Sequence, residues 1–146
     1  NIEQLDHAKN HSMTFNVPRG FVELSESVAC HSYSQRWNLM YEALWRIVHG
    51  EPHLLDLATD PTVSKLHEME KQIRRDCHKT KAFVRFRKIQ TDEGEQYIAW
   101  HHPDYRILKL VGPFFSRRFK GMGWSIFTPW ESAHWDGDGL TYCPGC

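Results

Sequence analysis

The sequence predicts an α+β fold in which N-terminal helices pack on a C-terminal antiparallel sheet with one inserted short helix. Apolar residues recur at helical spacing between residues 18 and 81. After that point the apolar period changes to two, which is typical of strands. Helices followed by strands favour α+β over an alternating α/β fold. We expect a polar lead-in over residues 1–16 and a single domain over residues 17–146.

Two helices are expected before residue 60. The first begins near Pro18 and has Phe21, Leu24 and Val28 on its apolar side. The second covers SQRWNLMYEALWRIVHG and ends at Gly50. The aromatic and aliphatic residues of this second helix fall at helical spacing, and we expect all of them in the core. They are Trp37, Met40, Tyr41, Leu44, Ile47 and Val48.

A third helix follows, with Asp60 as its cap and Pro61 at its first position. One side of this helix is apolar and is expected to pack, through Val63, Leu66, Met69, Ile73 and Cys77. The adjoining flank is basic and is expected to face solvent, through Lys71, Arg74, Arg75, His78 and Lys79. The helix therefore combines a packing face with a row of cations.

The next segment predicts a β-hairpin in which AFVRFRKI and EQYIAWHH are joined by QTDEG. Gly94 supplies the positive φ angle that such a turn requires. Alternation along the two strands places four polar or aromatic residues on one face of the hairpin. These are Arg85, Arg87, Tyr97 and His101.

The C-terminal third predicts a short strand at RILKL and then a helix from about Pro113 to Gly121. Phe114, Phe115 and Phe119 would anchor this helix and leave Arg117 and Arg118 accessible. The stretches WSIFTPW and SAHWDGDGLTYC predict two or three further strands, with a tight turn at their glycines.

Charge is distributed unevenly along the chain, although the net charge is zero. Residues 71–120 hold 13 Lys or Arg against five acids, a local net charge of +8. Such a segment can attract a polyanion even when the whole molecule is neutral. Arginine suits phosphate because its planar fork donates two hydrogen bonds, and nearby aromatic rings can stack on bases.

We therefore expect one surface that binds DNA, single-stranded or damaged duplex. Its residues would be Lys71, Arg74, Arg75, Lys79, Phe83, Arg85, Arg87, Tyr97, Arg117 and Arg118. The competing interpretation is that Arg85 and Arg87 pair with carboxylates of the acidic remainder of the chain.

Four residues are candidates for acid or base chemistry on a nucleotide or damaged base: His78, His101, His134 and Asp136. In a strand, His134 and Asp136 would lie on the same face, where the carboxylate could orient the imidazole. No nucleophile elbow, Walker loop or HExxH motif accompanies these residues. A structural role for each histidine remains open beside the catalytic one.

The cysteines predict neither a metal site nor a disulfide framework. Cys143 and Cys146 have the spacing of half a zinc site, but no second pair of ligands accompanies them. No cofactor motif is present. The chain has no apolar run long enough to span a bilayer and no signal-peptide pattern, so we expect a cytoplasmic protein without a membrane partner.

Several motifs occur in order along residues 17–145: RWNLMYEALWRIVHGEPHLLDLATDP, MEKQIRRDCHKTKAFVRFR, YIAWHHPDYRIL, PFFSRRF and WSIFTPWESAHWDG. Together they resemble an uncharacterised bacterial domain that is found fused ahead of UdgX-type uracil-DNA glycosylases. The same domain occurs beside a radical-SAM protein assigned to DNA repair. The resemblance implies a repair setting and a uracil-DNA glycosylase domain, or another repair enzyme, as a partner. Glycosylase activity itself is not implied, because this chain lacks the uracil-pocket motifs.

Three functions follow as hypotheses. The first is a DNA-repair accessory domain that binds nucleic acid through the basic and aromatic surface. The second is an enzyme acting on a nucleotide or damaged base. The third is a protein interaction module whose basic half meets an acidic partner.

Overall fold

The computed structural model describes residues 16–145, which form four α-helices, one 3₁₀ helix and a five-stranded sheet. The helices are α2 (Arg19–Ala29), α3 (Arg36–Val48), η1 (Leu54–Asp56), α4 (Pro61–Phe83) and α5 (Leu108–Arg118). The strands are β1 (Arg87–Thr91), β2 (Gly94–Trp100), β3 (Trp124–Phe127), β4 (Glu131–Trp135) and β5 (Leu140–Pro144). The α+β class is confirmed. Residues 1–15 of the predicted lead-in lie outside the described part of the chain.

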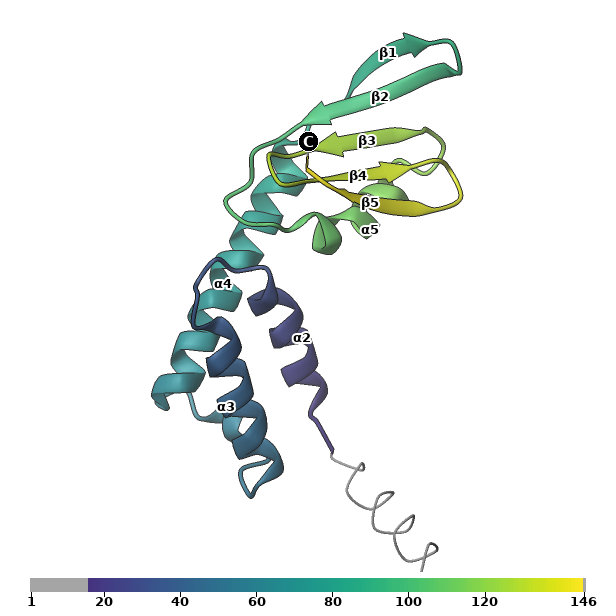
Figure 1. Cartoon of the computed structure of the whole chain (residues 1–146). Coiled ribbons are helices and arrows are strands. Elements are labelled where there is room, and N and C mark those ends of the chain that lie inside the picture. The colour runs from purple at the N-terminus through teal and green to yellow at the C-terminus, as the bar shows by residue number, and fades with distance from the viewer. Residues whose placement is uncertain (1–15, 146) are drawn as a thin grey trace, which may run out of the picture.

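Helix α4 runs through both halves of the elongated molecule (Figure 1). Its N-terminus is capped by Asp60, whose side chain accepts hydrogen bonds from the backbone N–H groups of Thr62 and Val63. At 1.5 Å per residue, its 23 residues extend about 34 Å. The buried positions near its start are Val63, Leu66 and Met69, in the helical core, and further along Ile73 lies in the core beneath the sheet. One helix therefore joins two hydrophobic cores.

The helical core is formed by α2, α3 and the first half of α4. Phe21, Leu24 and Val28 of α2 are buried, as predicted. In α3 the buried residues are Met40, Ala43 and Ile47.

The expectation that the aromatics of α3 lie in the core is wrong. Trp37 is 54% exposed and Tyr41 is 70% exposed. These rings lie on a flank turned about 100° from the buried stripe, on the same side as Trp45. The small side chain of Ala43 faces the core instead, so helical spacing alone does not show which of two apolar flanks packs.

The sheet has the strand order β1-β2-β3-β4-β5. All neighbouring pairs are antiparallel except β2 and β3, which are parallel. The prediction of a wholly antiparallel sheet is therefore wrong at this pair, because α5 carries the chain back across the sheet before β3 begins. A face with Ala99, Ile126 and Ala133 packs against α5, and the opposite face carries no described helix (Figure 1).

Helix α5 begins earlier than predicted, at Leu108, so the expected strand at RILKL is wrong. Leu108, Val111 and Phe115 are buried at helical spacing, and Pro113 lies inside the helix. Phe114 and Phe119 pack against the same core, as expected. The apolar positions of RILKL thus belong to a helical stripe rather than to a strand.

Asp76 is the single acid in the basic stretch RRDCHKTKAFVRFRK, and it is buried with 2% exposure. Its carboxylate accepts hydrogen bonds from the backbone N–H groups of Asp104 (3.2 Å) and Tyr105 (2.8 Å). Both donors lie in the loop between β2 and α5. The Asp76 side chain therefore attaches this crossover loop to the middle of α4.

We predict that Asp76→Ala lowers the free energy of unfolding by at least about 3 kcal/mol, because two buried N–H groups lose a charged acceptor. Asp76→Asn, which retains one acceptor oxygen, should lose roughly half as much. Chemical denaturation measures both. The exposed Asp92→Ala is the control and should stay within about 0.5 kcal/mol of the parent. Equal values for Asp76→Ala and Asp92→Ala would contradict the structural role of Asp76.

Candidate nucleic-acid interface

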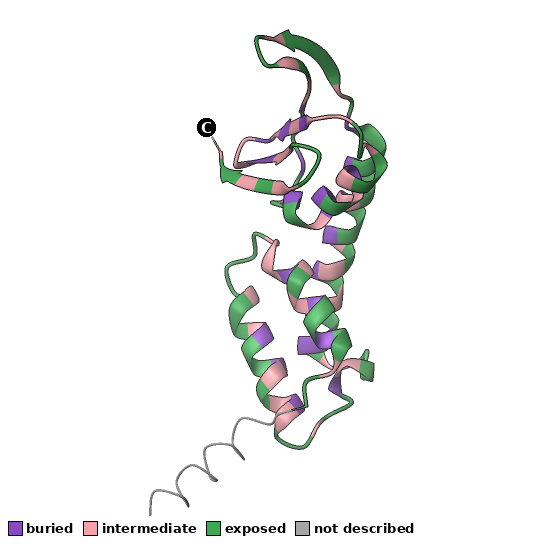
Figure 2. Cartoon of the chain, turned by 90° about the vertical axis from the view of Figure 1, so that its right-hand side faces the viewer, coloured by how far each residue is buried: buried purple, intermediate pink, exposed green. Residues whose placement is uncertain are grey.

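The solvent side of α4 carries the predicted row of cations. All of its basic residues after position 70 are exposed: Lys71, Arg74, Arg75, Lys79 and Lys81, together with His78. Figure 2 shows the buried positions of α4 on the side that faces the other elements. We call these six exposed residues the α4 ridge.

Most of the α4 ridge has no neutralising partner. Arg74 pairs with Glu70 (3.2 Å) and Lys79 pairs with Asp104 (3.2 Å). Within residues 16–145, no carboxylate lies at ion-pair distance from Lys71, Arg75 or Lys81. Like charges on a solvated helix surface repel and destabilise it modestly, so an unpaired row is a cost that a bound polyanion would relieve.

The end of α4 differs from the sequence prediction. The helix continues through Phe83, and β1 begins only at Arg87, whereas a strand was expected from Ala82. Arg85 lies between them and donates hydrogen bonds through Nη1 to the carbonyl groups of Ala82 (2.7 Å) and Val84 (3.0 Å). Its guanidinium thus caps the C-terminus of α4, where a positive charge is favourable.

The predicted hairpin face of Arg85, Arg87, Tyr97 and His101 does not form. Arg87 lies opposite Ile98, and Lys88 lies opposite Tyr97. Residues directly opposite share a face, so Arg87 and Tyr97 are on different faces of the hairpin. Tyr97 packs against the core beside Phe86. The pairing differs from the predicted one by one residue, which moves every side chain of one strand to the other face.

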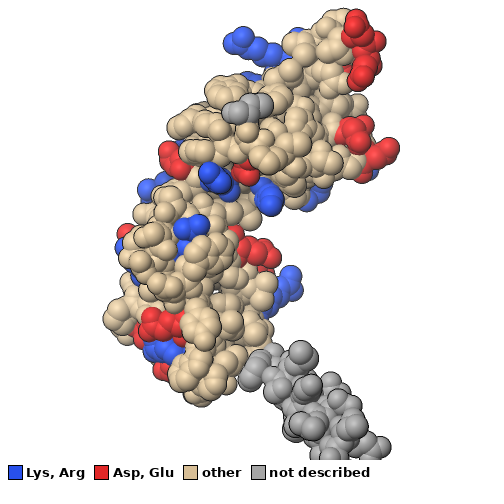
Figure 3. Space-filling view, viewed as in Figure 1, with Lys and Arg blue, Asp and Glu red and all other residues tan. Residues whose placement is uncertain are grey.

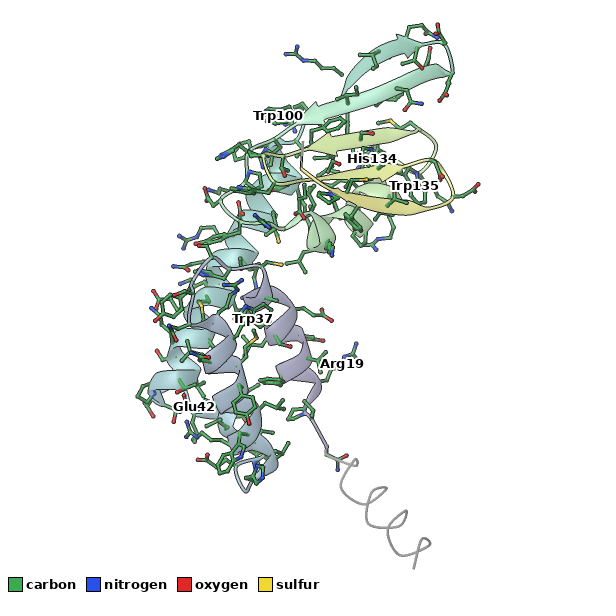
Figure 4. The ribbon with its side chains drawn as sticks, viewed as in Figure 1. Arg19, Trp37, Glu42, Trp100, His134 and Trp135 are labelled. Carbon is green, nitrogen blue, oxygen red and sulfur yellow. The ribbon has the colours of Figure 1, made fainter. Side chains whose placement is uncertain are left out.

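This register exposes an aromatic ring that is not among the predicted site residues. Trp100, the last residue of β2, is 69% exposed, and Phe83 is 66% exposed. The neighbouring His101 bonds Thr80 one turn before Phe83, which brings the end of β2 to the end of α4 (Nε2 to Oγ1, 3.0 Å). Figure 4 places Trp100 at this end of the sheet, remote from Trp37 on α3.

The helix-free face of the sheet continues from Trp100. Phe127 lies directly beside Trp100 in the parallel pair. The rings of Phe127 and His134 are nearly perpendicular, with their centroids 5.6 Å apart. Alternation places Arg87 on this same face. The sheet therefore offers a row of aromatic groups that begins where the α4 ridge ends.

The cations of α5 lie beside the α4 ridge. The Lys81 ammonium lies 5.1 Å from the centroid of the Phe114 ring on α5. Arg117 and Arg118, one turn after Phe114, are exposed on the last turn of α5. They extend the basic surface, whereas Tyr97 does not belong to it.

The competing interpretation, in which Arg85 and Arg87 pair with acids, fails for the described residues. Neither side chain has a carboxylate within ion-pair distance in residues 16–145. Figure 3 shows acidic groups at the right-hand tips of the sheet, where the β1–β2 and β4–β5 turns lie in Figure 1, and cations between the sheet and the helical half. Acidic groups also lie among these cations, as the pairs Arg74–Glu70 and Lys79–Asp104 show.

The four candidate catalytic residues are dispersed. His78 is exposed on the α4 ridge, and His101 is half-buried against Thr80. His134 bonds two serine hydroxyls, with Nδ1 2.8 Å from Ser125 Oγ and Nε2 2.9 Å from Ser132 Oγ. No shared centre of acid and base groups results.

The expectation that Asp136 orients His134 is wrong. The Asp136 carboxylate accepts hydrogen bonds from the backbone N–H groups of Asp138 and Gly139, each at 2.8 Å. These bonds close the turn before β5 and hold the pKa of Asp136 below its usual value. Both ring nitrogens of His134 are already occupied by serines.

The thiols have separate environments. Burial, and then the charge of Asp76, raises the pKa of Cys77 to about 11. Burial and the nearby Glu131 raise the pKa of Cys30. Cys143 is exposed, and Cys146 lies outside the described residues, so the CPGC pair is not placed.

Within the described chain, no helix has both the length and the apolar character needed to cross a bilayer.

A family described as a domain of unknown function (DUF4130) matches residues 34–137. The chain belongs to this family. The matched part of the DUF4130 domain runs from the start of α3 to the end of β4 and so includes the α4 ridge, Phe83 and Trp100. Comparison with curated proteins and with solved structures finds no match.

His101 gives a prediction about pH. Burial lowers its pKa below the ordinary 6.5; Asp76 and Asp104 oppose this shift, and His102 and Lys79 add to it. The unfolded chain then binds this proton more readily than the folded chain. The contribution of His101 to stability is therefore present above about pH 6.5 and is lost as the pH falls through the folded pKa.

His101→Gln removes this titration and retains a partner for Thr80. We expect its free energy of unfolding to fall less than that of the parent between pH 7 and pH 5 in urea titrations. His78→Gln, on the exposed ridge, is the control. Parallel pH profiles for the parent and His101→Gln would rule out this origin of acid sensitivity.

Proposed function

We propose that this DUF4130 domain binds single-stranded DNA. The observation that supports the proposal best is that the α4 ridge and the exposed Phe83 lie at the end of α4, which the His101–Thr80 hydrogen bond joins to the end of β2, where Trp100 is exposed. A row of unpaired cations can neutralise successive phosphates, and adjacent rings can stack on bases. This combination is typical of proteins that bind single strands.

Phosphate binding would be centred on Lys71, Arg75 and Lys81, which have no carboxylate partner in the described residues. Release of counterions from the strand then drives association, with little dependence on sequence. Lys81 contacts the Phe114 ring on α5, and Arg117 and Arg118 follow Phe114 by one helical turn, so they would extend the path of phosphate contacts. Lys79 contributes less, because Asp104 already neutralises it.

Base binding would use the rings at the end of the ridge. Trp100 and Phe83 expose about two-thirds of their surface. Arg85, two residues after Phe83, has donors beyond the Nη1 group that caps α4. The faces of bases are accessible only when the bases are unpaired. This arrangement therefore favours a single strand over an intact duplex.

We further propose a setting in DNA repair, with a uracil-DNA glycosylase domain or another repair enzyme as the partner. The support for this setting is the resemblance of the ordered motifs MEKQIRRDCHKTKAFVRFR, YIAWHHPDYRIL and WSIFTPWESAHWDG. A domain that holds the strand would raise the local concentration of substrate for a linked enzyme.

Fluorescence anisotropy with a labelled oligothymidine at several salt concentrations tests the phosphate contacts. Each neutralised phosphate contributes about −0.7 to the slope of log K against log salt on a single strand. We expect Lys71→Ala with Arg75→Ala to make the slope shallower by roughly 1.4. Arg19→Ala, at the far end of α2, should leave it unchanged. Similar slopes for the parent and the double variant would refute binding at the ridge.

Trp100→Ala tests the stacking contact in the same assay. Loss of one stacked base should weaken binding about 5-fold to 150-fold, since base stacking contributes roughly 1–3 kcal/mol. Trp37→Ala is the matched control, because Trp37 is also exposed but lies on α3. Equal loss in both variants, or loss in Trp37→Ala alone, would place the bases elsewhere.

A further inference from the structure

A cavity of about 1020 Å³ lies between the helical half and the sheet. It is bounded by the end of α2, the start of α3, the loop after β2, the first turn of α5 and the turn between β3 and β4. Its volume is at the upper end of the range common for small-molecule sites. None of the residues Lys71, Arg75, Phe83 or Trp100 lines it, so it is separate from the proposed strand-binding surface.

Three cations line this cavity: Arg36, Arg106 and Lys109. None of them has a carboxylate at ion-pair distance within residues 16–145. Arg36 Nε is buried and makes no hydrogen bond to any described residue, whereas Nη1 donates to the Tyr33 carbonyl (2.9 Å). The Arg36 guanidinium carbon also lies 5.0 Å from the centroid of the Trp37 ring. The accessible N–H groups of the three cations are the ones that could donate to an anionic ligand.

Aromatic groups form part of the wall. The rings of His31 and Tyr105 stack with their centroids 4.6 Å apart. His31 Nδ1 accepts the N–H of Tyr33 (3.0 Å), so the neutral ring carries its proton on Nε2 and donates it to Gln72 Oε1 (2.6 Å). Asp76 fixes the backbone of Tyr105. This wall is therefore held in place from α4 before any ligand binds.

The cavity also contains acceptors for N–H groups, since three carboxylates line it: Glu26, Asp104 and Glu131. Asp104 pairs with Lys79 outside the cavity lining. Glu131 lines it and uses Oε1 to accept the N–H of Leu108 at the start of α5, which leaves acceptor capacity on the carboxylate. Glu26 lines it without an ion-pair partner in the described residues. Trp130, from the turn between β3 and β4, adds a second aromatic surface.

We propose that this cavity binds a nucleoside monophosphate unit. Arg36, Arg106 and Lys109 hold the phosphate, Trp130 and Tyr105 contact the base, and Glu131 accepts its N–H groups. A plain phosphate would use the cations alone, whereas a nucleotide also uses the rings and the acids. The unit can be a free nucleotide or the phosphorylated end of a strand. The proposal does not depend on the α4 ridge.

Isothermal titration calorimetry of the full chain tests the proposal, with adenosine, guanosine, cytidine and uridine 5′-monophosphates, ribose 5-phosphate and inorganic phosphate as probes. At least one nucleotide should bind about tenfold or more tightly than ribose 5-phosphate, because only the nucleotide has a base to stack. Equal affinity for that nucleotide and ribose 5-phosphate would overturn the assignment, as would the absence of binding by every nucleotide.

Variants separate the two parts of the ligand. Arg106→Ala, at an exposed position, should weaken every probe about tenfold or more, and Trp130→Ala should weaken the nucleotides but not ribose 5-phosphate. Arg19→Ala and the double variant Lys71→Ala with Arg75→Ala should stay within twofold of the parent. Thermal melts by circular dichroism verify that each variant is folded. Unchanged nucleotide affinity in folded Arg106→Ala would overturn the proposal.

The source of the nucleotide is distinguished in the ridge double variant, which reduces ordinary strand binding. Displacement of the bound nucleotide by an oligonucleotide with a 5′-phosphate, but not by its 5′-hydroxyl form, assigns the cavity to a strand end. Failure of both oligonucleotides to displace it assigns the cavity to the free nucleotide. Loss of oligonucleotide binding with nucleotide binding retained would count against the proposed strand-binding function alone.

Discussion

The carboxylate of Asp76 connects the two halves of this molecule. It accepts the backbone N–H groups of Asp104 and Tyr105, so the loop that carries the chain from β2 to α5 is fixed against the middle of α4. This attachment positions Tyr105 for stacking on His31 from the end of α2. The parallel pairing of β2 with β3 requires the same crossover. Asp76 lies within a strongly basic segment, but its side chain is buried, where it stabilises the fold.

Because that acid is buried, the outer side of α4 presents no carboxylate after Glu70. The helix thus has two chemically distinct sides, one that organises the fold and one that faces solvent as the α4 ridge. Phe83 and Gln72, eleven residues apart, lie on the same flank of α4 beside the ridge, and Gln72 bonds His31 at the wall of the cavity. Both proposed sites depend on the orientation that the buried residues of α4 impose.

Strong local signals made α2, the start of α4 and the last strands predictable. The cap formed by Asp60 and Pro61 and the spacing of Phe21, Leu24 and Val28 identify α4 and α2 without tertiary information. The exposure of Trp37 was not predictable, since two apolar flanks of α3 compete and packing against α2 and α4 selects the one with Ala43. The register of the hairpin depends on where α4 ends, and a helix that continues through Phe83 brings Trp100 to the outer face. Of the two serine partners of His134, Ser132 lies two residues away in the same strand, whereas Ser125 is brought to it by the pairing of β3 with β4.

The central claim is that a single strand follows the outer side of α4 to Trp100, and the indole N–H signals of the tryptophans test it most directly. A ¹⁵N-labelled sample titrated with oligothymidine should show a large shift of the Trp100 indole signal. Backbone signals of Lys71, Arg75 and His78 should move with it at the same oligonucleotide concentrations. The signals of Trp37 and Trp45, exposed on α3, should stay in place. Movement of the Trp37 and Trp45 signals with an unperturbed Trp100 would contradict the account.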